Sequence, residues 1–397
     1  MKASAIVFVV LVVLIAVLFV FGGCEGPAGP GGKDGKDATI PPFNLEGYAP
    51  GIKCASCHTA DQDTTNFVAG RKYEWEHSKH AVGGRIDRNA LACAGCHTTE
   101  GFVKRYLAGW PANQSIASDI LHPSPPGCFA CHSPHARGNF TRRDTTAVTI
   151  TSFVTGVPDA VFDFGNGNIC ARCHQTRLSS TFLTGSTPSW KPDPTKTATT
   201  DTAKIYTSRW YPHYGVNAQM LMGTGGFQFV DFTYSGNSNH SSNTVIRQEG
   251  CPQCHMAEPV GSSVGEGGGH TFWVGYYPEG STTRSYVLNG CRASGCHLST
   301  ISSPNIPGTS TGGVGAQTLI LRNLDTLKQL LAQRNWVDTA AGLTRGTTSN
   351  PLRIVPASRA GAIWNYFFIE HEGSHGVHNT KYAYELLRSS IQELRKP

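Results

Sequence analysis

The sequence predicts a fold of loops and short helices with little β structure and a C-terminal α-helical part. Between residues 40 and 300, Gly, Pro, Ser, Thr and Asn interrupt the chain every few residues. Few stretches in that region favour a helix longer than three turns, and the β candidates, such as 147–154 and 226–234, are short. Beyond residue 315, apolar residues recur at helical spacing.

The composition excludes several classes of protein. The chain has 397 residues, of which 39% are hydrophobic and 10% are aromatic, so it can build a sizeable core and is not a disordered chain. Its net charge is +6, but its basic residues form no long run, so the sequence gives little support to nucleic-acid binding. An irregular region this long buries little apolar area by itself. We therefore expect something other than polypeptide to fill part of its core.

Two C-terminal stretches are predicted to be amphipathic helices. Ile320, Leu324, Leu327 and Leu331 form one apolar stripe, which predicts a helix over 316–333. A second stripe predicts a helix over 379–394, with Ala383, Leu387, Ile391 and Leu394 on one face. Such stripes are typical of core packing, and we assign them no chemistry.

The N-terminus has the pattern of an export signal. Lys2 precedes an apolar run over 5–21, and Gly22 and Gly23 precede Cys24. This predicts a lipoprotein-type signal peptide over 1–23 with Cys24 as the lipidated residue, although an uncleaved membrane anchor is the alternative. Residues 24–47 include four Gly-X-Y triplets, too few for a collagen helix, and are predicted to be a flexible tether to the lipid anchor.

The decisive pattern is a repeated Cys-x-x-Cys-His motif. It occurs five times, whereas composition alone predicts about 0.02 occurrences by chance. A sixth site has four residues between its cysteines instead of two. We number the motifs 1 to 6 in chain order, and their cysteines are Cys54 and Cys57, Cys93 and Cys96, Cys128 and Cys131, Cys170 and Cys173, Cys251 and Cys254, and Cys291 and Cys296.

This motif is typical of covalent c-type haem attachment. Two thiols about one helical turn apart can add to the two vinyl groups of one porphyrin, and the following imidazole then becomes the proximal ligand of the iron. The predicted cofactors are six haem c groups, with His58, His97, His132, His174, His255 and His297 as proximal ligands. The linker of motif 6 must loop out to serve the same roles. Zinc sites and disulfides also use cysteine pairs, but neither requires a histidine after each pair.

The remaining histidines are numerous enough to supply a second ligand to every iron. Ten histidines lie outside the motifs, whereas the chain has four methionines, so His/Met ligation cannot be general. The expected distal ligands are His80, His122, His135, His213, His270 and His378. His77 is an alternative to His80, His240 is expected to be solvated, and His371 and His375 to hydrogen-bond propionates.

The chain resembles the multihaem c-type cytochromes. The segment Cys128-Phe-Ala-Cys-His-Ser-Pro-His135 is similar to an element of that family in which the second histidine ligates a neighbouring haem. Residues 376–387 resemble the C-terminal helical region of cytochrome c nitrite reductase-like proteins. The resemblance implies loops and short helices wrapped around stacked haems in a cytochrome domain over 48–300, followed by a helical part over 301–397 that supplies a distal ligand.

The expected function is electron transfer through six bis-His haems in respiratory or extracellular electron transport. The implied partners are other redox proteins, such as cytochromes, a quinol-oxidising complex or an extracellular acceptor, with the membrane reached through the N-terminal lipid. We expect an exported protein on the periplasmic side or at the cell surface. The alternatives are a nitrite or hydroxylamine reductase with one open haem, although no Cys-x-x-Cys-Lys motif occurs, and a cytochrome filament subunit.

Overall fold

The computed structural model describes residues 58, 66–82, 85–134, 139–177, 188–259, 264–297, 299–308 and 311–397. The predicted signal peptide, the tether, Cys54, Cys57 and His135 lie outside these residues. Residues 46–397 form one compact unit. Within the described ranges, no helix has the length and apolar character needed to span a membrane.

Short helices carry most of the regular structure before residue 300, as the sequence predicts. None of those described exceeds nine residues, and several coincide with a Cys-x-x-Cys-His motif. These helices are α2 (Val68–Glu76), α3 (Lys79–Val82), α4 (Ala94–His97), α5 (Thr99–Leu107), α6 (Cys128–Cys131), α8 (Asn168–Ala171), α10 (Asn217–Met222), α11 (Asn239–Ser242), α12 (Thr244–Glu249) and α13 (Pro252–His255). Single turns of 3-10 helix lie at Gly165–Gly167 (η2), Gly269–Thr271 (η4) and Ala357–Ala360 (η6).

The β structure of the described chain consists of small antiparallel strand pairs. The pairs are β1 (Val148–Ile150) with β2 (Ala160–Phe162), β3 (Ala203–Ile205) with β8 (Leu352–Ile354), β4 (Gly275–Tyr276) with β5 (Ser285–Tyr286), and β6 (Val337–Asp338) with β7 (Leu343–Thr344). Strand β1 lies within the predicted segment 147–154, where Val148 and Ile150 are buried and Thr149 is exposed.

The second β candidate, 226–234, is not a strand. Its backbone is paired by a side chain instead of a neighbouring strand, because Asn365 accepts the N–H of Phe227 at 2.7 Å and donates to its carbonyl at 2.8 Å. The backbone of this segment is irregular, and the side chains of Phe227 and Phe229 are buried in the core. The prediction of a strand over 226–234 is therefore wrong, because this segment packs its side chains into the core without pairing to another strand.

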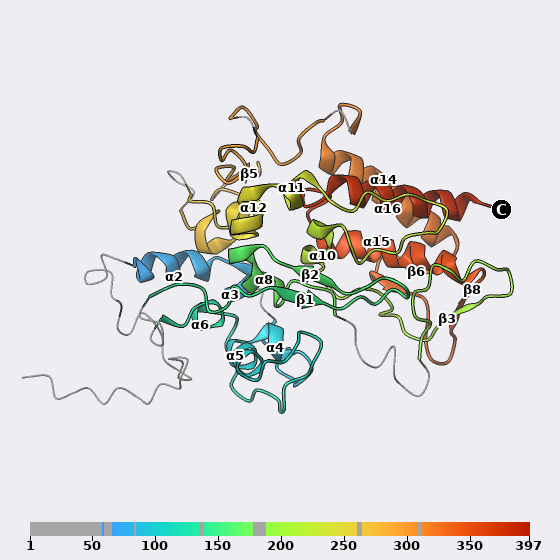
Figure 1. The fold of residues 1–397 in the computed structure, drawn as a ribbon, viewed down its shortest axis with the longest axis horizontal. Coiled ribbons are helices and arrows are strands. Elements are labelled where there is room, and N and C mark those ends of the chain that lie inside the picture. Colours follow the sequence, from blue (N-terminus) through green and yellow to red (C-terminus); the bar gives the residue numbers. More distant parts are fainter. Residues whose placement is uncertain are drawn as a thin grey trace, which may run out of the picture. The chain divides into compact units, whose positions relative to one another are not determined.

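The C-terminal part contains α14 (Ala316–Gln333), α15 (Gly361–Glu372) and α16 (Thr380–Arg395). Helix α14 has the predicted bounds, and α16 begins one residue after the expected start, because the Asn379 side chain caps it by accepting the N–H of Tyr382 at 3.1 Å. The three helices pack against one another (Figure 1).

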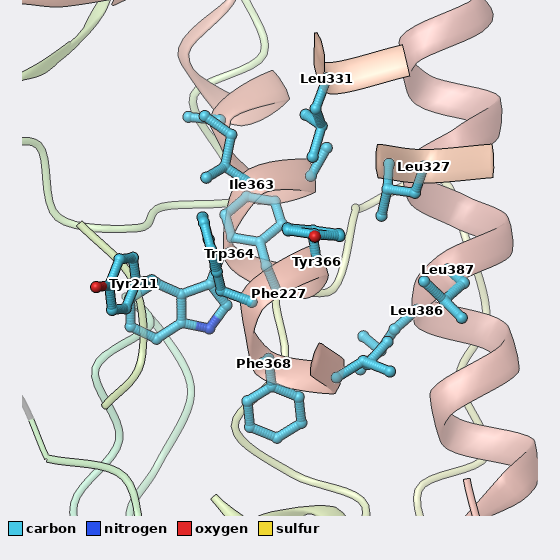
Figure 2. Packing of buried hydrophobic residues seen from close by; sticks show 14 of the residues in the cluster. Tyr211, Phe227, Leu327, Leu331, Ile363, Trp364, Tyr366, Phe368, Leu386 and Leu387 are labelled. Atoms are coloured by element: carbon cyan, nitrogen blue, oxygen red, sulfur yellow. The ribbon is translucent and has the colours of Figure 1, made fainter. Parts of the chain in front are cut away.

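Helix α15 lies in the middle of the main hydrophobic core. Figure 2 shows Trp364 and Phe368 of α15 among side chains from α14, α16 and the segment around Phe227. Trp364 is 1% exposed, and its indole N–H donates to the carbonyl of Gly225 at 3.0 Å. The C-terminal helices thus share one core with residues 154–229, and they hold the His371–His378 segment against the motif-bearing part of the chain.

Candidate haem-binding centres

The described motifs fold in the same local way. In each of motifs 2 to 5, the backbone N–H of the histidine donates to the carbonyl of the first cysteine, at 3.3, 2.8, 2.9 and 3.0 Å. The donors are His97, His132, His174 and His255. One helical turn therefore brings the two thiols and the imidazole together, which is the arrangement that attachment of one porphyrin requires.

Motif 6 recovers this arrangement in spite of its longer spacer. The N–H of His297 donates to the carbonyl of Cys291 at 2.9 Å, and the N–H of Cys296 donates to Ala293 at 3.0 Å. Gly295 has a φ of +81° and open space around its Cα. The extra residues therefore form an outward turn, as the sequence analysis expected.

Five motif histidines each lie beside a histidine from a distant part of the chain. The distances between ring centres are between 6.0 and 6.4 Å. The pairs are His97 with His213 at 6.3 Å, His132 with His270 at 6.4 Å, His174 with His80 at 6.1 Å, His255 with His378 at 6.0 Å, and His297 with His240 at 6.0 Å.

This separation fits two imidazoles on opposite sides of one iron. A metal–imidazole bond is about 2.0–2.1 Å and a ring nitrogen lies about 1.1 Å from the ring centre, so opposed ligands place their ring centres about 6.3 Å apart. Two ligands of a tetrahedral zinc ion would instead have ring centres about 5.1 Å apart. The ring-centre distances of the pairs are therefore closer to those of two ligands on opposite sides of an iron than to those of two ligands of a tetrahedral zinc ion.

The hydrogen bonds of these rings also suit iron ligation. In several of them Nδ1 faces an acceptor, which leaves Nε2 for a metal. His255 Nδ1 lies 3.0 Å from the carbonyl of Phe272, and His213 Nδ1 lies 2.9 Å from that of Tyr214. The pKa of His80 is lowered to about 4, mainly by burial and secondly by the neighbouring His174. The pKa of His255 is also lowered to about 4, mainly by burial and secondly by His378. Both rings are thus neutral at pH 7, the form that binds a metal.

The candidate distal ligands differ in their surroundings. Of His77 and His80, it is His80 that lies beside a motif histidine, whereas His77 is exposed and its Nδ1 faces the carbonyl of Tyr73 at 2.8 Å. His240 was expected to be solvated, but it is half-buried beside His297. The capping box of α11, in which Ser238 and Ser241 bond each other reciprocally, fixes the position of this histidine.

His122 is exposed, and no ring contact in the described ranges joins it to another histidine. His371 is buried by packing, since its ring stacks on Tyr214 at 3.8 Å and its Nδ1 faces the carbonyl of Pro212 at 3.0 Å. The sequence gives no local signal for His240, because its partner in motif 6 comes close only through the fold.

Cysteines from different motifs also lie together. Cys96 lies beside Cys173, Cys170 beside Cys251, and Cys254 beside Cys291. Burial, followed by the nearby Cys170, raises the pKa of the Cys131 thiol to about 12. No disulfide joins any of the described cysteines. Motif 4 is thus adjacent to motifs 2, 3 and 5, and motif 5 is adjacent to motif 6.

Two other side chains connect neighbouring motifs. Arg105 is 3% exposed and donates to Cys96 Sγ of motif 2 at 3.2 Å and to the Arg172 carbonyl of motif 4 at 2.8 Å. The ring of Phe140 lies 6.1 Å from His58 and 6.0 Å from His132, which brings motif 1 beside motif 3.

No protein-family model matches this sequence, and no curated protein matches it. The chain is similar to the solved structure of the outer cell wall cytochrome OcwA, with a TM-score of 0.42 and 18% sequence identity. The similarity covers 89% of this chain and 59% of that one, so the chain spans about three fifths of that protein's length. Because a TM-score below 0.5 does not establish a common fold, the function has to follow from the chain's own side chains.

Proposed function

We propose that this chain is an electron-transfer protein that binds six haem c groups, each with its iron between two histidines. The observation that carries this proposal is the set of five histidine pairs with ring centres 6.0–6.4 Å apart, each of which contains a motif histidine. A haem iron with two imidazole ligands exchanges one electron and leaves no position open to a substrate.

For motif 1, we propose His135 as the second ligand opposite His58. His135 lies outside the described residues, but Phe140, which follows it closely in the sequence, lies beside His58. His132 and Phe140 flank His135 in the sequence, and the Phe140 ring contacts both His132 and His58. This assignment uses a histidine that the sequence analysis expected to be a distal ligand.

The contacts between motifs support a continuous route for electrons. Adjacent thiols connect motif 2 to motif 4, motif 4 to motif 5, and motif 5 to motif 6. Motif 3 joins at motif 4 through Cys131 and Cys170, and motif 1 joins motif 3 through Phe140. Every motif thus has at least one neighbour, as electron hopping requires.

We further propose that residues 1–23 are a lipoprotein-type signal, that Cys24 carries the lipid, and that residues 24–47 are the tether. The apolar run, the two glycines before Cys24 and the Gly-X-Y triplets support this. An exported protein anchored in this way would exchange electrons with other redox proteins at a membrane. A quinol-oxidising complex or an extracellular acceptor would be a suitable partner.

The haem content and spin state of the purified holoprotein test the proposal. A pyridine-haemochrome assay together with the intact mass should give six covalent haems per chain, and the spectra should be low-spin in both oxidation states. A wild-type high-spin haem that reduces nitrite or hydroxylamine with turnover would instead indicate the reductase alternative. Fewer than six haems would refute the stoichiometry.

A further inference from the structure

One of the five histidine pairs has a buried carboxylate hydrogen-bonded to its Nδ1. His378, the partner of His255, donates from Nδ1 to Oε1 of Glu372 in a short contact. The Nδ1 atoms of other paired rings face neutral acceptors, namely Asn217 Oδ1 for His174, Phe272 O for His255, Tyr214 O for His213 and Thr141 O for His132.

The position of Glu372 is fixed by the surrounding structure. Its side chain is 0% exposed, and Oε2 accepts the N–H of Ser374 at 3.0 Å and its hydroxyl at 2.6 Å. Its backbone carbonyl, the last of α15, accepts from Asn217 Nδ2 at 2.8 Å. Gly373, with a φ of +75°, turns the chain so that the carboxylate faces His378.

We propose that Glu372 is a positioning residue that lowers the reduction potential of the iron between His255 and His378. This inference rests on the proposed haem function. A carboxylate that accepts from Nδ1–H makes the imidazole a stronger electron donor through Nε2. Oxidised haem also carries one more positive charge than reduced haem, and a buried negative charge nearby stabilises it. Both effects favour the ferric state.

A second glutamate provides an internal comparison. Glu74 Oε2 lies 3.5 Å from His270 Nδ1, beyond the usual length of a hydrogen bond, and Arg71 lies 3.4 Å from the same oxygen and offsets its charge. Glu74 therefore acts on the ring of His270 less strongly than Glu372 acts on that of His378. The iron beside Glu372 is held by motif 5, which contacts motif 6 through Cys254 and Cys291.

The test is a Glu372→Gln variant of the full holoprotein. Glutamine keeps an oxygen acceptor of similar size and removes the charge. Spectroelectrochemical titration should show one of six components shifted upwards, with the electron paramagnetic resonance signal of one low-spin centre altered. Glu74→Gln should shift a different component by less. Glu385→Gln is the matched control, since that carboxylate also accepts from the N–H and hydroxyl of a serine, Ser235, at 2.8 Å each, but contacts no paired histidine.

Ser374→Ala gives a second, opposite test. Removing the hydroxyl that donates to Oε2 leaves more negative charge on the carboxylate, so the component that Glu372→Gln raises should fall. Six haems with no component shifted in either variant, or with all six shifted equally, would overturn the role of Glu372 while leaving the haem assignment intact. Fewer than six haems in the wild-type protein would refute the proposed function itself.

Discussion

Replacing His240 by alanine tests the least expected of the histidine pairs. The ring of His240 lies 6.0 Å from that of His297, with their planes at 82°, in the motif that has the unusual spacer. If these two rings hold one iron, the variant leaves that iron with His297 alone. One of six haems then changes, so roughly one sixth of the low-spin signal should become high-spin.

Carbon monoxide gives a direct count of the opened irons. It binds reduced haem only where an axial position is open, so the wild-type protein should bind none and His240→Ala should bind about one molecule per chain. His122→Ala is the matched control, because His122 is exposed and is one of the six distal ligands expected from the sequence. If His122→Ala opens an iron and His240→Ala does not, the reading of ring distances as ligation is wrong.

Three further predictions concern the core, the sixth motif and the charge. Asn365→Ala should lower the free energy of unfolding by about 2–5 kcal/mol in guanidinium titrations, because it unpairs both backbone groups of Phe227, whereas Asn323→Ala, with one bond to its own helix, should cost under about 1 kcal/mol. The double variant Cys291→Ala and Cys296→Ala should carry five covalent haems instead of six by haemochrome assay and mass; an unchanged count would show that motif 6 is not an attachment site. Each electron added removes one positive charge from a crowded interior, so a redox titration should spread over a range of potentials, and a fit to a single potential for all six haems would contradict this.

Local sequence patterns predicted the features that depend on neighbouring residues. The bounds of α14 follow from the stripe of Ile320, Leu324, Leu327 and Leu331, all of which are buried. The turn geometry of the motifs follows from their spacing. Helix α15 gave no stripe, because eleven of its twelve residues are buried and its polar face is missing. Hydrophobic periodicity detects a helix that has one buried and one exposed face, whereas α15 is buried on all sides.

The distal histidines could be predicted only in part, for a related reason. His80, His213, His270 and His378 stand out by their local residues, and each lies beside a motif histidine. His240 is surrounded by Ser and Asn, as a solvated loop residue would be. Its pairing depends on α11 packing near motif 6, which no window of the sequence around it records.

The hydrogen bond from His297 to Cys291 has a consequence for reading such sequences in general. It spans six residues, whereas the corresponding hydrogen bond in motifs 2 to 5 spans four, and the two additional residues lie in a turn that includes Gly295. The first cysteine and the histidine are thus joined by a backbone hydrogen bond in motif 6 as they are in motifs 2 to 5. A search for Cys-x-x-Cys-His alone therefore misses a site of this kind, and we expect a haem count made by that search to be a minimum.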